Sequence, residues 1–224
     1  NYNFNALNNP NLSCIQVDDV NFATTNLINI DATTSFNTLC DVPNGFTAIP
    51  DDNFEQALIN LNLDDVLDDK VLTANIIDVT TLDVKNSNID DLTGIQDFAS
   101  LTHLNIANNS LDNTDFLSTL TNLKVLRIFG NQINGTINIT ENTALEELYA
   151  GTNNFTSLNV AQNTNLKKLS LAYNELNSID LTNNLQLTHL RIEDNELATI
   201  DITRNELLEE VNLQGNQLSN DHHH

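Results

Sequence analysis

The residues of this chain that are able to do chemistry are few and lie far apart. The histidines at 222–224 are typical of a purification tag, which leaves His103 and His189 as candidate general bases or metal ligands. Neither has a serine or cysteine nucleophile beside it with an orienting carboxylate, and we find no glycine-rich phosphate loop. Carboxylate pairs such as Glu146 and Glu147 are common in an acidic chain. The sequence therefore predicts no enzyme and no cofactor.

The segment DDVLDDKVL, residues 64–72, is the one place where carboxylates gather closely. Four aspartates within six positions suggest a calcium site. The spacing lacks the Asp-x-Asp-x-Asp-Gly order of a calcium loop, and no glutamate follows at the twelfth position. A solvated acidic turn is the favoured interpretation, with calcium as the open alternative.

Net charge limits the classes of partner. Acidic residues outnumber basic ones 31 to 8, a net charge of −23, which argues against nucleic acid and anionic membrane surfaces. No run of 18 apolar residues is present, so we expect no membrane insertion. The chain is 40% hydrophobic with regular spacing, which indicates a folded core instead of disorder.

From residue 79 onward the chain repeats itself every 21 or 22 residues. The repeats begin at Val79, Leu101, Leu123, Leu145, Leu166, Leu187 and Leu208. Six of the seven begin Leu-x-x-(Leu or Val)-x-(apolar), as in LTHLNIANN and LKKLSLAYN, which is the leucine-rich-repeat pattern. The fourth and sixth residues should point inward from a short strand, and stacked strands should form one parallel sheet.

Asparagine, with 40 residues against 34 leucines, also follows the repeat. The ninth position holds Asn109, Asn131, Asn153, Asn174, Asn195 and Asn216, and the first repeat has Ser87 there. A second set, Asn142, Asn163, Asn184 and Asn205, stands three residues before the next repeat begins. A side-chain amide both donates and accepts, so we expect both sets to satisfy backbone groups at turns.

Positions three, five, seven and eight of each repeat are expected on or beside the concave face of the sheet. Position three holds Thr81, His103, Val125, Glu147, Lys168, His189 and Glu210, and position five holds Asp83, Asn105, Arg127, Tyr149, Ser170, Arg191 and Asn212. His103 and His189 are then four repeats apart, about 19 Å at a strand spacing of ~4.8 Å. That distance is too long for a shared metal or a catalytic dyad.

Binding is the better prediction for this face. The candidate ligand-binding residues are Arg127, Phe129, Tyr149, Tyr173, Arg191, His103 and His189. The first five, which we call the concave strip, occupy four consecutive repeats, and their types are enriched at interface hot spots or stack on sugars. They suit a partner carrying carboxylate, sulfate or acidic side chains. The alternative is that the cations only neutralise Glu147, Glu193 and Glu210 along the sheet, which would leave the aromatics unexplained.

The array needs a cap before Val79, and residues 50–63 are predicted to supply a helix. Asp51 or Asp52 is its candidate N-cap, and Phe54, Ala57, Leu58 and Leu61 share one face. On the convex side, residues 89–100 and 111–122 suggest single helical turns, and residues 174–184 and 195–205 suggest extended chain.

Residues 1–42 contain a further strand pattern, Leu12, Ile15 and Val17, which we do not find repeated downstream. This is typical of the last repeat and closing cap of a preceding array, so we expect a fragment of a longer array. Cys14 and Cys40 lie in this segment, and a disulfide formed in an oxidising compartment is the favoured prediction over a pair of buried thiols.

Several phrases resemble extracellular leucine-rich-repeat proteins of the Bacteroidetes, particularly those of marine flavobacteria. They are NNPNLSCIQVDDV, IPDDNFEQALI, DDVLDDKVLTANI and IDDLTGIQDFASLTHLNIANN, which together with the repeats cover nearly the whole chain. The resemblance implies secretion and a role in adhesion or recognition at the cell surface. It carries no catalytic set of residues.

The predicted fold class is an α/β-type leucine-rich-repeat solenoid with a parallel concave β-sheet, a mostly extended or 3-10 convex side and a helical N-terminal cap. Residues 1–42 are assigned to the upstream remnant, 43–78 to the cap, 79–220 to seven repeats and 221–224 to the tag. The chain is predicted to be a non-catalytic secreted or cell-surface module that binds a protein or polysaccharide. A second copy of the chain, in head-to-tail self-association, is a further expected partner. The alternative is a structural spacer with no ligand of its own.

Overall fold

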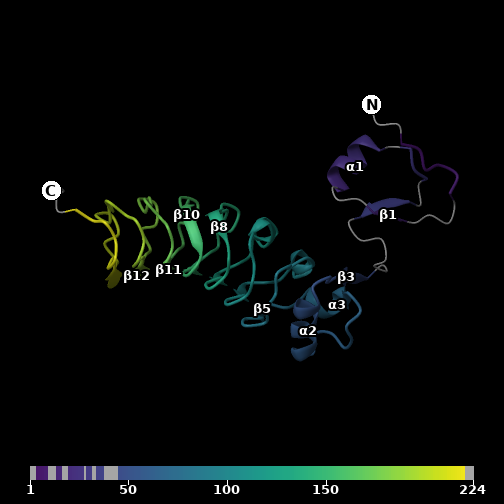
Figure 1. Cartoon of the computed structure of the whole chain (residues 1–224), viewed down its shortest axis with the longest axis horizontal. Helices are drawn as coiled ribbons and strands as arrows, with labels where there is room; N and C mark the ends of the chain where they lie inside the picture. Colours follow the sequence, from purple (N-terminus) through teal and green to yellow (C-terminus); the bar gives the residue numbers. More distant parts are fainter. Residues whose placement is uncertain are drawn as a thin grey trace.

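The computed structural model describes residues 4–9, 14–16, 20–27, 29–31, 34–37 and 45–219. Figure 1 shows an elongated molecule in which the repeats stack along the long axis; the C-terminus lies at one end of this array and the cap elements at the other end of it. Among the described residues, no helix is long and apolar enough to cross a membrane.

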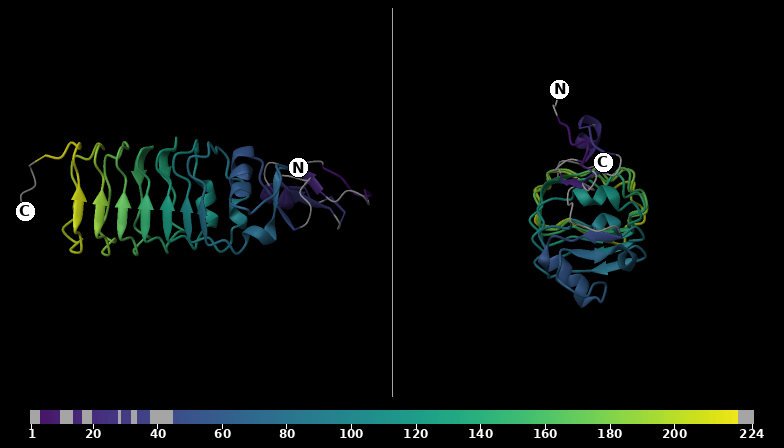
Figure 2. Two further views of the ribbon diagram at one scale, coloured as in Figure 1. Left: turned by 90° about the horizontal axis from the view of Figure 1, so that it is seen from below. Right: turned by 90° about the vertical axis from the view of Figure 1, so that its right-hand side faces the viewer.

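One parallel sheet of seven strands runs the length of the array (Figure 2). Its strands are β5 (Thr81–Asp83), β6 (His103–Asn105), β7 (Val125–Arg127), β9 (Glu147–Tyr149), β11 (Lys168–Ser170), β12 (His189–Arg191) and β13 (Glu210–Asn212). They lie side by side in chain order, and every register aligns position three with position three and position five with position five. The predicted repeat phase therefore places each strand correctly.

The core is built from the fourth and sixth positions of the repeats. From Leu82 to Leu190 the fourth-position leucines are at most 1% exposed, and the sixth-position residues from Val84 to Ile192 are at most 2% exposed. Full burial of one such side chain stabilises the fold by about 1.5–3 kcal/mol. At the last strand the pattern changes, since Val211 is 40% exposed. Each repeat therefore depends on a neighbour to bury its apolar face.

Buried asparagines join each repeat to the one before it. The Asn131 Nδ2 donates to the Ile106 and Ile128 carbonyl oxygens at 3.1 and 3.0 Å, and its Oδ1 accepts from the Leu111 backbone N–H at 3.1 Å. In the second set the Asn163 Nδ2 donates to the Ile139 and Asn142 carbonyl oxygens, both at 2.9 Å. Both sets therefore satisfy backbone groups at turns, as predicted.

The convex side changes along the array. The first two repeats have 3-10 turns, η1 (Ile95–Asp97) and η2 (Asp115–Thr119). The next two have short parallel strands, β8 (Asn134–Ile137) and β10 (Asn154–Leu158). Residues 176–181 and 197–202 are neither helix nor strand, as expected for repeats of 21 residues.

The cap consists of β3 (Phe46–Ala48), α2 (Asp52–Asn60), β4 (Lys70–Leu72) and α3 (Thr73–Ile76), with β3 antiparallel to β4. Asp51 is the N-cap of α2. Phe54, Ala57 and Leu58 are buried as predicted, but Leu61 is 42% exposed. Leu61 is the C-cap residue of α2 and keeps a helical hydrogen bond to the Ala57 carbonyl oxygen at 3.2 Å, but at this end of the helix its side chain is only partly covered.

The N-terminal segment contains β1 (Cys14–Gln16), α1 (Val20–Asn26) and β2 (Ser35–Asn37). β1 and β2 are parallel, and Cys14 aligns with Ser35, 21 residues later. The expectation that this strand pattern is not repeated was therefore wrong, because Phe36 in β2 aligns with Ile15 in β1. Leu12, Val17, Cys40 and the tag lie outside the described residues, so the Cys14–Cys40 disulfide stays a prediction.

Candidate functional site

The concave face is formed by the two outward-facing rows of the seven-stranded sheet, positions three and five. Successive side chains of a strand alternate between the two faces of a sheet, so these rows share the face opposite the core leucines. The register aligns each row across neighbouring strands, for example Arg127 with Tyr149 and Glu147 with Lys168. Charged and aromatic side chains from adjacent repeats are therefore direct neighbours.

Glu147 is the centre of the charged part of this face. Its Oε1 lies 3.1 Å from the Lys168 Nζ, and its Oε2 accepts from the Tyr149 hydroxyl at 2.9 Å and lies 3.7 Å from an Arg127 Nη. Desolvation acts to raise the pKa of Glu147, but the hydrogen bonds from Lys168 and Tyr149 and the nearby cations outweigh it, so the pKa is lowered. Glu147 is therefore an anion that holds two cations and a tyrosine in place.

Arg127 and Tyr149 are the pair of the concave strip that the structure brings into contact. The Arg127 guanidinium carbon lies 4.8 Å from the centre of the Tyr149 ring, within the range of a cation–π interaction. The Arg127 side chain is 37% exposed, and its contact with Glu147 is long. Most of its hydrogen-bond donors consequently remain available at the surface.

The C-terminal part of the strip is arranged differently. The Nη2 and Nε of Arg191 donate to the Glu193 Oε1 at 2.7 and 3.2 Å, and this bond and the charge of Glu193 raise the pKa of Arg191. Phe129 and Tyr173 are 36% and 59% exposed. Arg127 and Lys168 thus pair with Glu147 across the sheet, whereas Arg191 pairs within its own repeat and Glu210 lies 4.0 Å from His189. Phe129 and Tyr173 stay exposed beside these pairs.

The two histidines have the same local setting in different repeats. The Thr102 hydroxyl donates to the Thr80 carbonyl oxygen at 3.0 Å and lies 2.9 Å from the His103 Nδ1. A hydroxyl has one proton to give, so the His103 Nδ1 must be the donor in the second contact, and neutral His103 has a free acceptor at Nε2. His189 repeats this arrangement with Thr188 and Lys167. β7, β9 and β11 separate the two histidines, so they do not meet.

A hollow of about 320 Å³ opens at the N-terminal end of the concave face. Its polar lining is Thr81, Asp83, His103, Asn105 and Arg127. Asp83 and Asn105 were expected on the concave face but were not among the predicted binding residues. Both occupy position five of their repeats and lie directly opposite each other in β5 and β6, and this pattern could have indicated them from the sequence.

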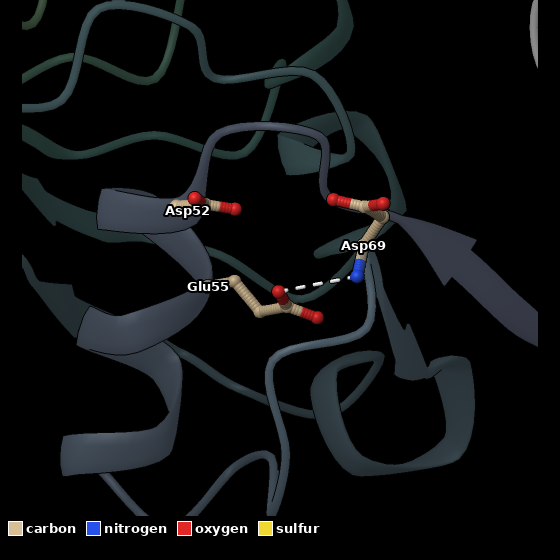
Figure 3. A group of neighbouring side chains, drawn as sticks. All are labelled: Asp52, Glu55 and Asp69. Atoms are coloured by element: carbon tan, nitrogen blue, oxygen red, sulfur yellow. Dashed lines mark hydrogen bonds between the residues drawn. The ribbon is translucent and has the colours of Figure 1, made fainter.

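The acidic turn at 64–69 is held by a residue that the sequence analysis did not select. Figure 3 shows Asp52, Glu55 and Asp69, whose carboxylate oxygens lie within 4.8 Å of one another. Glu55 is fully buried, and its Oε1 accepts from the Asp68 and Lys70 backbone N–H groups at 3.0 and 2.9 Å. Its Oε2 accepts from the Asp69 N–H at 3.2 Å. Glu55 therefore ties the turn to α2, and both of its oxygens are already engaged.

The stacked repeats and their shared register decide the fold. It is a leucine-rich-repeat solenoid. Internalin C2 of Listeria monocytogenes has a similar solved structure, 24% identical with a TM-score of 0.58, covering 81% of this chain and 93% of that one. A leucine-rich-repeat protein of Leptospira interrogans is 29% identical with a TM-score of 0.55, covering 59% of this chain and 36% of that one. This solenoid thus matches only about a third of the Leptospira chain. No protein-family model and no curated protein matches it.

Proposed function

We propose that this solenoid is a non-catalytic binding module, secreted or exposed at a cell surface, that recognises a protein or polysaccharide through its concave face. The observation that carries the proposal is the Arg127–Tyr149 pair, which presents an exposed guanidinium against a ring beside the exposed Phe129. Arginine and aromatic side chains held in one orientation lose little entropy when a ligand binds. The resemblance to extracellular proteins of the Bacteroidetes supports the location. In this proposal residues 1–42 are the remnant of a preceding array, residues 43–78 are the cap and residues 79–220 are the repeats.

A structural spacer remains the second candidate, and one observation favours it. Glu147 forms ion pairs with Arg127 and Lys168, and Glu193 forms one with Arg191, so these cations already have partners beside the sheet. A spacer would need only these pairings and would retain no ligand.

Glycan arrays and pull-downs on this chain, followed by the double change Arg127→Ala and Tyr149→Ala, test the proposal. We expect the double change to weaken the binding free energy of a captured ligand by at least ~2 kcal/mol. The matched control is Arg204→Ala, which removes an exposed arginine from the turn at 203–206. Unchanged affinity in the double variant with an intact fold would reject the concave face and leave the spacer as the better hypothesis.

A further inference from the structure

The hollow between β5 and β6 carries hydrogen-bonding groups that the fold does not use. The Asn105 Oδ1 accepts from the Ala107 N–H at 3.3 Å, whereas no hydrogen bond within residues 45–219 uses the Asn105 Nδ2. The His103 Nδ1 is bonded to Thr102, and the His103 Nε2 has no hydrogen-bond partner in that range. His103 and Asn105 are two residues apart on one strand and so lie on the same face. A free donor and a free acceptor therefore stand side by side at the hollow.

Charge in the hollow is balanced. The Asp83 carboxylate lies 3.2 Å from the Lys85 Nζ, and Arg127 lies 3.7 Å from Glu147. One anion, Asp83, and one cation, Arg127, thus line the hollow, and each has an ion-pair partner outside the lining, in a chain whose net charge is −23. A ligand with several negative charges would be repelled by the Asp83 carboxylate in the lining and by the net negative charge of the whole molecule.

We propose that this hollow binds a neutral saccharide, through neighbouring hydroxyl groups of one sugar ring. A hydroxyl both donates and accepts, so adjacent hydroxyls match the Asn105 amide donor, the His103 Nε2 acceptor and the Asp83 carboxylate opposite Asn105. Arg127, held against Tyr149, supplies further donors at the rim. This inference rests on the proposed function and names the class of ligand.

A protein partner fits the hollow less well. Protein hot spots, whether aromatic residues or arginines, cluster in well-packed, fully desolvated pockets. The apolar lining residues here, Leu82 and Leu104, are each 1% exposed and offer no apolar floor. The polar, planar lining suits a ligand that is itself covered with hydroxyl groups.

The chain supplies matched controls for the test, because Asn212 repeats the setting of Asn105 in the last repeat. The Asn212 Oδ1 accepts from the Gln214 N–H at 3.2 Å, as the Asn105 Oδ1 does from Ala107. Asn105→Asp and Asn212→Asp therefore keep the same turn bond and add the same charge, but Asn105→Asp alone removes the donor in the hollow.

Binding is measured by calorimetry with neutral β-1,3-glucan, β-1,4-glucan and α-mannan oligosaccharides, and with polygalacturonate and dextran sulfate as acidic probes. We expect at least one neutral oligosaccharide to bind at millimolar concentration or below. Asn105→Asp and His103→Ala should each weaken binding at least ~10-fold, and the Asn212→Asp control should weaken it less than ~2-fold. Asn105→Ala against Asn212→Ala repeats the comparison without added charge, and thermal denaturation checks each fold.

Three results would overturn the inference: no binding of any neutral probe, binding of the acidic probes alone, or equal losses in the hollow and control variants. The proposed function has a separate point of failure. Suppose that no neutral oligosaccharide binds, but that a captured protein or acidic glycan binds the wild type and not the Arg127→Ala and Tyr149→Ala variant. The concave face is then still a binding site, and only the saccharide inference fails.

Discussion

Replacing Asp51 by asparagine should show how firmly the cap is attached to the array. The Asp51 Oδ1 accepts from the Asn53 and Phe54 N–H groups of α2 at 2.7 and 2.9 Å. Its Oδ2 accepts from the Asp90 and Asp91 backbone N–H groups in the first repeat at 2.8 and 3.0 Å. Asparagine is about as good an N-cap as aspartate, so the first pair survives Asp51→Asn. The second pair then faces an NH₂ group, and two N–H donors lose their acceptor.

The magnitude follows from these two lost bonds. A hydrogen bond to a charged acceptor contributes about 1.5–3 kcal/mol, and some water can reach the site once the amide rotates, so we expect Asp51→Asn to cost about 2–4 kcal/mol. Asp51→Ala should cost ~1 kcal/mol more because it also removes the N-cap. Asp52→Asn is the control, since Asp52 is exposed in the first helical turn and should contribute only ~0.3–1 kcal/mol through the helix dipole.

Urea denaturation at pH 7 measures all three variants, and acid pH gives a second test. Burial acts to raise the pKa of Asp51, but its four backbone hydrogen bonds outweigh burial and lower the pKa below the usual 3.8. A lowered folded-state pKa gives stability that is present above pH ~3.8 and is lost as the pH falls through the folded value. The difference between wild type and Asp51→Asn should therefore shrink below pH ~4. A loss at pH 7 no larger than that of Asp52→Asn would refute this account.

Three further results are expected. Thermal denaturation should show that Gly94→Ala destabilises the fold by more than 2 kcal/mol and Gly135→Ala by much less. Both glycines have positive φ, but a Cβ on Gly94 would lie 2.3 Å from a backbone oxygen of β3. A Cβ on Gly135 would meet no atom within 4 Å. Equal losses would show that φ alone sets the cost. Mass spectrometry after alkylation without reductant should find Cys14 and Cys40 unmodified, and two alkylated thiols would contradict the bridge. Sedimentation should show concentration-dependent head-to-tail association through the exposed apolar surface around Val211 in β13, and a strict monomer at high concentration would count against it.

The repeats could be predicted from sequence because two independent requirements share one period. Leu126 must face the core, and Asn131 must reach the backbone of the preceding repeat, so the strand and the turn are fixed together. The same phase placed Arg127 and Tyr149 next to each other. Local pattern alone was enough for these elements.

The remainder depends on backbone geometry that side-chain spacing does not encode. Glu55 follows Asp52 in an ordinary first helical turn, and its burial arises because the 68–70 turn directs three N–H groups at it. The hollow depends on which donors stay unused after the turns form, as at Asn105. The exposure of Leu61 follows from its place at the end of α2, and the apolar period does not locate the last residue of that helix.

The asparagine bonds also give this molecule a mechanical character. They run from each repeat to the one before it, and so along the long axis of the array in Figure 1. Tension applied at the two ends must pass through a series of nearly equivalent junctions, and each repeat contacts only its neighbours. The array should then extend by releasing one repeat at a time, with each release dissipating work and the remaining repeats still folded.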